Sequence, residues 1–268
     1  MTTTTASSLY QQGKLHEAIA AMEAEVKQKP ADVDRRGFLA ELLCLAGELE
    51  RAEKQLEVLV RTAPDRQVGV SLFRQLVHAE QARQDFFRQG RLPELVEKPD
   101  ARMELRLKAA VAERAGDRAG AGRLLDEMEA ARKPVAGDLD GAPFSDLRDL
   151  DDLVADSLEL LTSTGKYFLV PLARVESIEL RKPERPRDLL WRRALVQVTD
   201  GPEGEVYLPA IYAASYGKDD VPFQLARQTE WTERSGGPVR GKGLRTFLIG
   251  DDARTLLELG TIRFGGKS

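Results

Sequence analysis

Few residues of this sequence are of the types that usually carry out catalysis or bind metals. The chain has one cysteine, Cys44, and two histidines, His16 and His78. Neither histidine lies in an HxxxH or HExxH pattern, so the sequence offers no ligand set for zinc and no base for a serine or cysteine nucleophile. Cys44 lies in the apolar run LLCLA, which predicts a buried thiol. We therefore expect no enzymatic activity, metal or cofactor.

A group of aspartates in DGAPFSDLRDLDDLVADSLELL is the second candidate. Clustered carboxylates can bind a metal or act as a general acid and base. Aspartates are also common at helix starts and on solvated helix faces, and this interpretation is preferred. It predicts an acidic amphipathic helix with an apolar face of Leu150, Leu153, Val154, Leu158 and Leu161. The aspartates of the predicted helix are Asp146, Asp149, Asp151, Asp152 and Asp156.

The segment GGPVRGKG, residues 236–243, resembles a phosphate-binding loop. It matches GxxxxGK, but Gly243 stands where a serine or threonine would bind magnesium. The context fails as well, because such a loop follows a strand and opens a helix. The segment is better explained as a tight glycine turn that brings Arg240 and Arg245 to a sheet or to acidic neighbours.

Composition and charge exclude several classes of partner. Of the 268 residues, 42% are hydrophobic and 31% are charged, and the formal net charge is −4. Basic and acidic residues are mixed without a basic block, so nucleic acid is not an expected partner. No apolar run reaches the roughly 18 residues of a membrane span, and the beginning MTTTTASSLYQQ lacks the basic and apolar parts of a secretory signal. We expect a cytoplasmic protein that does not bind membranes.

The elements that position these residues begin with an internal repeat. The stretch GKLHEAIAAMEAEVKQKP, residues 13–30, is followed at a spacing of 34 residues by GELERAEKQLEVLVRTAP, residues 47–64. The period and the residue types resemble the tetratricopeptide repeat, a pair of antiparallel helices. Glycine ends the first helix, alanine allows the second helix to cross closely, and proline stops it. The equivalent residues are Gly13 and Gly47, Ala18 and Ala52, and Pro30 and Pro64.

A third copy of the pattern lies in LRLKAAVAERAGDRAGAGRLLDEMEAARKP. Its Gly116 follows Gly47 by two periods and one residue. We expect the residues between the second and third copies to form an extra helical pair. Among them, SLFRQLVHAEQARQDFFRQG has helical periodicity. We expect residues 5–133 to form a short helical solenoid, in which each unit buries its apolar face by stacking on the next.

Such a solenoid has a concave groove lined by the first helix of each unit, which suits a peptide or a helix from a partner. The alternative is that this surface only packs on the second half of the chain. The expected groove residues are Asp34, Gly37, Glu41, Cys44 and Leu45 in the second repeat, and Met103, Arg106 and Ala110 in the last.

The second half has the periodicity of strands. Strands are predicted in KYFLVPLARVESIELR, ALVQVTD, EVYLPAIYA, LRTFLIG and GTIRFG, with a hairpin turn at GPEG and a short helix at DDARTLLELG. The fold class is therefore a tetratricopeptide-like helical solenoid, residues 1–134, followed by a small mixed α+β domain with a largely antiparallel sheet, residues 135–268. An alternative pocket for a partner is lined by the aromatic residues Trp191, Tyr207, Tyr212 and Trp231.

Several phrases of this half resemble one protein family. They are DGAPFSDLRDLDD, YFLVPLARVESIEL, PRDLLWRRALV, EVYLPAIYA and TEWTERSGGPVRGKGLRTFLIGDDARTLLEL. Together with the repeats they resemble the ImpE/TagJ family of type VI secretion accessory proteins over nearly the whole chain. The most specific part is WRRA, the Tyr-Leu-Pro strand and VRGxGxR followed by GDD. Lys242 departs from the apolar or small residue that is more usual between the two glycines.

The resemblance implies a cytoplasmic, non-enzymatic adaptor. It also implies a partner, the N-terminal helix of the small subunit of the contractile sheath, and a link to sheath handling by the disassembly ATPase. Two alternatives stay open. One is a generic tetratricopeptide chaperone for another protein, and the other is a hydrolase or nucleotide-binding enzyme that uses the second domain.

Overall fold

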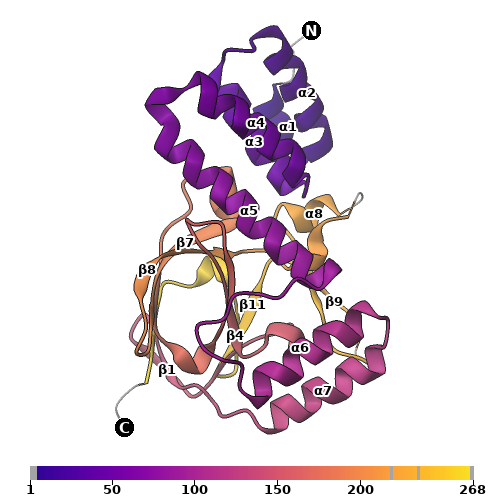
Figure 1. Cartoon of the computed structure of the whole chain (residues 1–268), viewed down its shortest axis with the longest axis vertical. Helices are drawn as coiled ribbons and strands as arrows, with labels where there is room; N and C mark the ends of the chain where they lie inside the picture. Colours follow the sequence, from indigo (N-terminus) through magenta and orange to yellow (C-terminus); the bar gives the residue numbers. More distant parts are fainter. Residues whose placement is uncertain (1–4, 218–219, 234–235, 266–268) are drawn as a thin grey trace.

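Helices fill the first half of the chain and strands dominate the second (Figure 1). The computed structural model describes residues 5–217, 220–233 and 236–265. The predicted fold class, a helical solenoid followed by an α+β domain with an antiparallel sheet, is confirmed. None of the described helices has both the length and the apolar character needed to cross a membrane. The helices of the first half are α1 (Ala6–Gln11), α2 (Leu15–Gln28), α3 (Val33–Leu45), α4 (Leu49–Thr62), α5 (Gln67–Gln89), α6 (Ala101–Arg114) and α7 (Arg118–Ala130).

The three copies of the repeat share one turn geometry. Gly13, Gly47 and Gly116 follow α1, α3 and α6 with φ of 80°, 75° and 80°, a left-handed conformation that suits glycine. In each copy the residue after the glycine donates its backbone N–H to the carbonyl five residues back, at 2.8 to 2.9 Å. The repeated glycines therefore mark where each first helix turns into the second.

Alanine at the helix crossing is fully buried in every copy. Ala18, Ala52 and Ala121 each have an exposed fraction of 0%. Because an alanine side chain ends at Cβ, the two helices of each hairpin can approach closely. In α4, Leu56 and Leu59 complete the buried face beside Ala52.

One long helix, rather than a helical pair, occupies the slot between the second and third copies. α5 has 23 residues and ends at Gly90, whose φ of 83° is left-handed. The chain then runs to the sheet, where Glu94 forms a parallel bridge with Phe168 of β5 (Tyr167–Pro171). The predicted extra pair is wrong, because the residues after Gly90 pair with the sheet instead of returning along α5. In Figure 1, α5 crosses from the first hairpins to the strands, and the α6–α7 hairpin lies apart.

The strands form one large antiparallel sheet and two small sheets. The order in the large sheet is β2-β1-β13-β6-β7-β8-β4-β5. The predicted turn at GPEG joins β7 and β8, which pair antiparallel. The small sheets have the orders β12-β11-β3 and β10-β9. The further strands are β1 (Gly137–Leu139), β2 (Ala142–Phe144), β3 (Leu147–Asp149), β4 (Ser157–Leu161), β6 (Val175–Leu180), β7 (Trp191–Val198), β8 (Glu203–Pro209), β9 (Thr229–Trp231), β10 (Gly241–Gly243), β11 (Thr246–Ile249), β12 (Asp252–Thr255) and β13 (Thr261–Phe264).

Two segments predicted as helices are strands and turns. The acidic stretch forms β3, a 3₁₀ turn at Asp152–Val154, and β4. In β4, Leu158 and Leu160 pack in the core of the strands, whereas Leu161 packs with the helices. This alternation has the period of a strand, although the apolar spacing along the stretch also suits a helix. The segment DDARTLLELG likewise forms β12 and a 3₁₀ turn, because β12 pairs with β11.

The two halves share a hydrophobic core. One cluster of buried residues combines the helices with Leu161, Tyr167, Trp191 and Ile211 of the second half. A second cluster lies among the strands. The boundary proposed at residue 134 falls in the connection between α7 and β1, and the division into 1–134 and 135–268 stays a prediction.

We predict that Ala52→Trp destabilises the protein. Ala52 is fully buried at the helix crossing, and overpacking of this kind costs about 1–3 kcal/mol or more. Chemical denaturation followed by circular dichroism measures the change in the free energy of unfolding. Ala20→Trp is the matched control, because Ala20 is exposed on α2. Equal stability of the two variants would contradict the close crossing.

Candidate functional site

A concave groove lies between α3, α4, α5 and the loop that precedes β7. It has a volume of about 580 Å³. Asp34, Gly37 and Glu41, which the sequence predicts as partner-binding residues, line it together. We call this surface the α3–α5 groove. Its other lining residues are Val33, Phe38, Leu56, Leu59, Arg66, Gly69, Val70, Phe73, Arg185 and Arg187.

Two glycines inside helices keep the α3–α5 groove open. Gly37 of α3 and Gly69 of α5 line it, and a Cβ at either position would meet nothing within 4 Å. Neither residue has the positive φ that favours glycine. Glycine inside a helix costs about 0.5–1 kcal/mol relative to alanine, and the packing of the chain gives no reason for that cost at either position. Because glycine has no side chain, the backbone of α3 at Gly37 and of α5 at Gly69 is accessible from the groove.

The second half of the chain supplies one side of the α3–α5 groove. Arg187, in the 3₁₀ turn η4 (Pro186–Leu189), has its Nε 3.9 Å from Glu41 Oε1 and its guanidinium 4.7 Å from the centre of the Phe73 ring. Burial raises the pKa of Glu41, and the positive charges of Arg187 and Arg185 oppose that shift. A ligand in the groove would therefore contact both halves.

Two residues expected in the groove lie in the core of the helices instead. Leu45 is 1% exposed and Cys44 is 0% exposed. Leu45 is the last residue of α3, where the chain turns into α4 and the two helices pack on each other. Burial raises the pKa of the Cys44 thiol well above its ordinary value. The predicted buried thiol is confirmed, whereas Leu45 does not face the groove.

In the last repeat, the face of α6 that was expected to line the groove packs on the second half of the chain. Met103 of α6 is 4% exposed and packs with Val154 and Leu169 of the second half. Arg106 is 2% exposed and forms an ion pair with Asp156. The structure therefore does not bring Met103 and Arg106 to an open groove, because α6 packs this face on the strands. For this repeat, the alternative of a surface that packs on the second half is correct.

A buried chain of ion pairs joins α5 to the sheet. Arg83 of α5 donates its Nε–H to Glu159 Oε1 of β4 at 2.8 Å. Arg245 Nη1 lies 3.0 Å from Glu159 Oε2, and Arg245 also pairs with Asp149. All four side chains are at most 1% exposed, so each charge depends on its partners because an unpaired buried charge is costly. We call Arg83, Glu159, Arg245 and Asp149 the buried joint.

The four aromatic residues predicted as an alternative pocket do not converge on one cavity. Trp191 is 1% exposed and donates its Nε1–H to a carboxylate of α5 at 3.1 Å. Tyr212 donates its hydroxyl to Asp149 Oδ1 at 2.8 Å, and its ring packs edge-on against Trp231. Tyr207 donates its hydroxyl to a neighbouring glutamate at 3.2 Å. The structure brings Trp191 and Tyr207 to one cavity between α5 and the β7–β8 hairpin, whereas Tyr212 and Trp231 do not line it.

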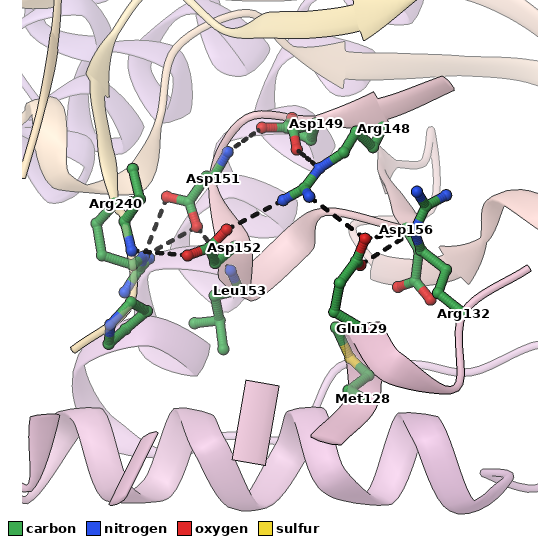
Figure 2. A network of polar contacts seen from close by, with 12 residues as sticks. Met128, Glu129, Arg132, Arg148, Asp149, Asp151, Asp152, Leu153, Asp156 and Arg240 are labelled. Atoms are coloured by element: carbon green, nitrogen blue, oxygen red, sulfur yellow. Dashed lines mark hydrogen bonds and ion pairs between the residues drawn. The ribbon is translucent and has the colours of Figure 1, made fainter. Parts of the chain in front are cut away.

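Each of the five aspartates in residues 146–156 has an arginine partner. In Figure 2, Asp151 accepts a hydrogen bond from Arg240 Nε at 2.9 Å, and Asp152 accepts one from Arg148 at 3.0 Å. Among the residues that the structure describes, no group of three or more histidines, cysteines and carboxylates is placed to hold a metal ion. Ion pairing therefore accounts for the cluster, and the predicted helix face is wrong. The other pairs are Asp146 with Arg132, Asp149 with Arg245, and Asp156 with Arg102 and Arg106.

The glycine turn brings its two arginines to acidic neighbours, as the sequence predicts. Arg240 pairs with Asp151, and Arg245 belongs to the buried joint. Packing explains the glycines of the motif. A Cβ at Gly241 would lie 2.4 Å from a tyrosine ring, and one at Gly243 would lie 1.9 Å from a backbone oxygen. The motif forms β10, which pairs with β9, and it does not open a helix.

The two carboxylates of the buried joint have opposite pKa shifts. Burial acts to raise the pKa of Glu159, but Arg83 and Arg245 outweigh burial and lower it to about 2. Burial raises the pKa of Asp149 to about 6, Arg245 opposes the shift, and the negative charge of Asp151 adds to it. Glu159 differs because it lies between two guanidinium groups. The two guanidinium groups of the buried joint therefore stabilise the ionised form of Glu159.

Sequence reasoning missed the buried joint and the basic side of the groove. Glu159 lies inside the apolar run SLELL, and a charge in such a run signals a buried partner. The partner, Arg83, is 76 residues away in the chain, and no local pattern connects the two. Arg187 lies in PRDLLWRRALV, a phrase that the sequence singles out only by its family resemblance, and Arg185 precedes that phrase.

Two protein-family models match different parts of the chain. Residues 141–263 match the model described as ImpE protein, and residues 9–72 match a model of the tetratricopeptide repeat. The second half is thus similar to ImpE protein, and the residues before it are similar to tetratricopeptide repeats. The predicted resemblance to the ImpE/TagJ family is confirmed.

Two relatives cover nearly the whole chain. The type VI secretion system accessory component TagJ of Pseudomonas aeruginosa is 28% identical over 259 residues, which are 97% of this chain and 90% of that protein. The crystal structure of protein VPA1032 from Vibrio parahaemolyticus superposes with a TM-score of 0.92 at 27% identity and covers 98% of both chains. The arrangement of both halves is therefore similar to that in a solved structure.

We predict that Glu159→Gln removes an acid-sensitive part of the stability. In the folded protein the pKa of Glu159 is about 2, below its ordinary 4.5, so its contribution is complete above that ordinary value and is lost as the pH falls towards about 2. Near neutral pH the variant should be less stable by about 3–5 kcal/mol, because two buried guanidinium groups lose a partner. Denaturant unfolding at a series of pH values measures the difference.

The difference in stability between wild type and Glu159→Gln should shrink below about pH 4.5. Glu104→Gln is the control, because Glu104 is exposed on α6, and it should change stability by less than about 0.5 kcal/mol. A difference for Glu159→Gln that stays constant with pH would contradict the stabilised carboxylate.

Proposed function

We propose that this protein is a non-enzymatic accessory protein of a type VI secretion system that binds a helix in the α3–α5 groove. The proposed ligand is the N-terminal helix of the small subunit of the contractile sheath, and binding would link the sheath to its handling by the disassembly ATPase. The name of the Pseudomonas aeruginosa relative supports the secretion system. The tetratricopeptide repeats support a role in binding other proteins.

The pair of glycines in the α3–α5 groove is the observation that carries this proposal. Gly37 and Gly69 belong to different helices, yet both line the same groove, and a Cβ at either would touch nothing. The fold would gain stability from alanine at each position. A ligand that lies close to the helix backbone gives a reason for glycine that the free protein lacks.

The lining of the groove favours a helix as the ligand. None of the lining residues belongs to a strand, so the groove offers no strand edge for an extended peptide. Its apolar lining includes Phe38, Val70 and Phe73, which suit the apolar stripe of an amphipathic helix. Small residues such as the two glycines allow a second helix to approach closely.

The alternatives differ in the support they have. A generic chaperone would use the same groove for another ligand, so it differs from the proposal only in the identity of that ligand. A nucleotide-binding enzyme would need the glycine motif to cradle phosphates, whereas β10 pairs with β9 and its glycines are required by packing. No observation on the described residues favours a hydrolase.

We predict that Gly37→Gln blocks binding without harming the fold. A Cβ at position 37 meets nothing within 4 Å, and the rest of the glutamine side chain would extend into the groove. The free energy of unfolding should rise by up to about 1 kcal/mol, because glycine is a poor helix former. The affinity for a fluorescent peptide of the sheath helix should fall by about tenfold or more, a change of about 1.4 kcal/mol, measured by anisotropy.

Two controls accompany this variant. Ala20→Gln places the same side chain on an exposed position of α2 and should leave the affinity unchanged. Gly37→Ala removes the flexibility of glycine but adds only one methyl group, so it should raise stability with a smaller loss of affinity. Unchanged binding by Gly37→Gln would show that the peptide docks elsewhere.

A further inference from the structure

Arg187 lies where two cavities meet on α5. The α3–α5 groove and a second cavity of about 410 Å³, between α5 and the β7–β8 hairpin, both include Gly69 and Arg187 in their lining. Phe73 lines only the first cavity, and Leu72 and Leu76 line only the second. Residues 69, 72, 73 and 76 share one face of α5, because they are three and four residues apart. This face therefore continues from one cavity into the other.

The side chain of Arg187 bridges the two helices that form the walls of the groove. Its Nε lies 3.9 Å from Glu41 Oε1 of α3, and its guanidinium lies 4.7 Å from the centre of the Phe73 ring of α5. Glu41 follows Gly37 by four residues, and Phe73 follows Gly69 by four. Both contacts are therefore about 6 Å, or one helical turn, beyond the two glycines. Arg187 crosses the groove at the end of the part that the glycines open.

The open part of the groove is short. At its other end the exposed side chains of Asp34 and Arg66 form an ion pair. Asp34 and Glu41 are seven residues apart on α3, which is about 10 Å of helix. A ligand helix of three turns is about 16 Å long. Such a helix, lying along the groove, therefore reaches the bridge at Arg187 or the one at Arg66, and only Arg187 stands between two cavities.

Aromatic side chains lie beneath Arg187. Phe73 is 3% exposed, and its ring packs edge-on against Trp191, which is 1% exposed. The guanidinium of Arg187 lies over the Phe73 ring. Aromatic residues in well-packed pockets supply much of the affinity of many interfaces. Moving Arg187 away would give a ligand access to such a residue at the junction of the two cavities.

The contacts that hold Arg187 over Phe73 are weak ones. At 3.9 Å, Arg187 and Glu41 are too far apart for a hydrogen bond. Burial lowers the pKa of Arg187 and raises that of Glu41, because each charged group loses water. Both charges would regain water if the arginine side chain moved out of the groove. A ligand can therefore exchange these contacts for its own.

We propose that Arg187 is a movable partition, which separates the two cavities in the free protein and moves out when a helix enters, so that the cavities become one groove along α5. The proposal deepens the proposed function, since it concerns how the same groove admits its helix. Only molecules with Arg187 moved out would bind the whole ligand, so the partition lowers the affinity of the wild type.

Arg187→Ala separates a partition from a residue that holds the ligand, because the two roles predict opposite changes. The full-length variant should bind a fluorescent peptide of the sheath helix about three- to tenfold more tightly than the wild type. This gain corresponds to a wild type in which the partition is open in about 10–30% of molecules. Fluorescence anisotropy measures the affinity, and stopped-flow mixing should show faster association.

Arg185→Ala is the matched control. Arg185 also lines both cavities and carries the same charge. Among the described contacts, it neither pairs with Glu41 nor stacks on Phe73. Its replacement should not tighten binding. Thermal unfolding checks that both variants are folded at the temperature of the binding measurement.

A second measurement needs no peptide. Nile red is an uncharged dye that fluoresces in apolar surroundings, so removal of a cation does not itself change its attraction to the protein. Arg187→Ala should bind more Nile red than the wild type or Arg185→Ala, because the ring of Phe73 becomes accessible. Where the peptide binds, an excess of it should displace the additional dye.

The outcomes separate the partition from the proposed function. Unchanged or weaker peptide binding by Arg187→Ala, or an equal gain for Arg185→Ala, overturns the partition and leaves helix binding in the groove intact. Equal dye binding by Arg187→Ala and the wild type also overturns the partition. No binding of the peptide to the wild type or to Arg187→Ala overturns the proposed function. Tighter peptide binding and more dye for Arg187→Ala alone support the partition.

Discussion

The arrangement of this molecule depends on the ion pairs of Glu159. Its carboxylate is buried between the guanidinium groups of Arg83 and Arg245. Removing such a charge from water is expensive, and only well-placed partners compensate for it. One partner belongs to α5 and the other follows the glycine turn. The three side chains can therefore satisfy one another only when α5 lies across β4. This requirement specifies the relative position of the two halves more sharply than apolar packing alone would.

That position decides which part of the solenoid is open. The concave side of α6 is covered by the strands, with Met103 and Arg106 buried. The first two hairpins stay free on the side of α3, and η4 brings Arg187 to their edge. The resulting groove is formed by both halves. The second domain therefore does more than cover the repeats, because it supplies Arg185 and Arg187 to the lining of the groove.

Arginine dominates the chemistry of the second domain. Asp146, Asp149, Asp151 and Asp152 can lie close together because each has a guanidinium partner. Figure 2 shows how Arg148 connects Asp152 and Glu129 across two elements. The same residue types that suggest a metal site in the sequence thus hold the domain together.

The sequence by itself determined the repeats, the change from helix to strand and the family resemblance. Those features depend on local backbone preferences and periodicity, such as the left-handed glycines Gly13 and Gly47, which neighbouring residues encode. Only the tertiary structure decided that residues 146–161 form strands rather than a helix, because their apolar spacing suits both and pairing with distant strands selects one. It alone also decided that α6 is covered and that Glu159 meets Arg83, because contacts between residues far apart in the chain depend on how the whole chain packs.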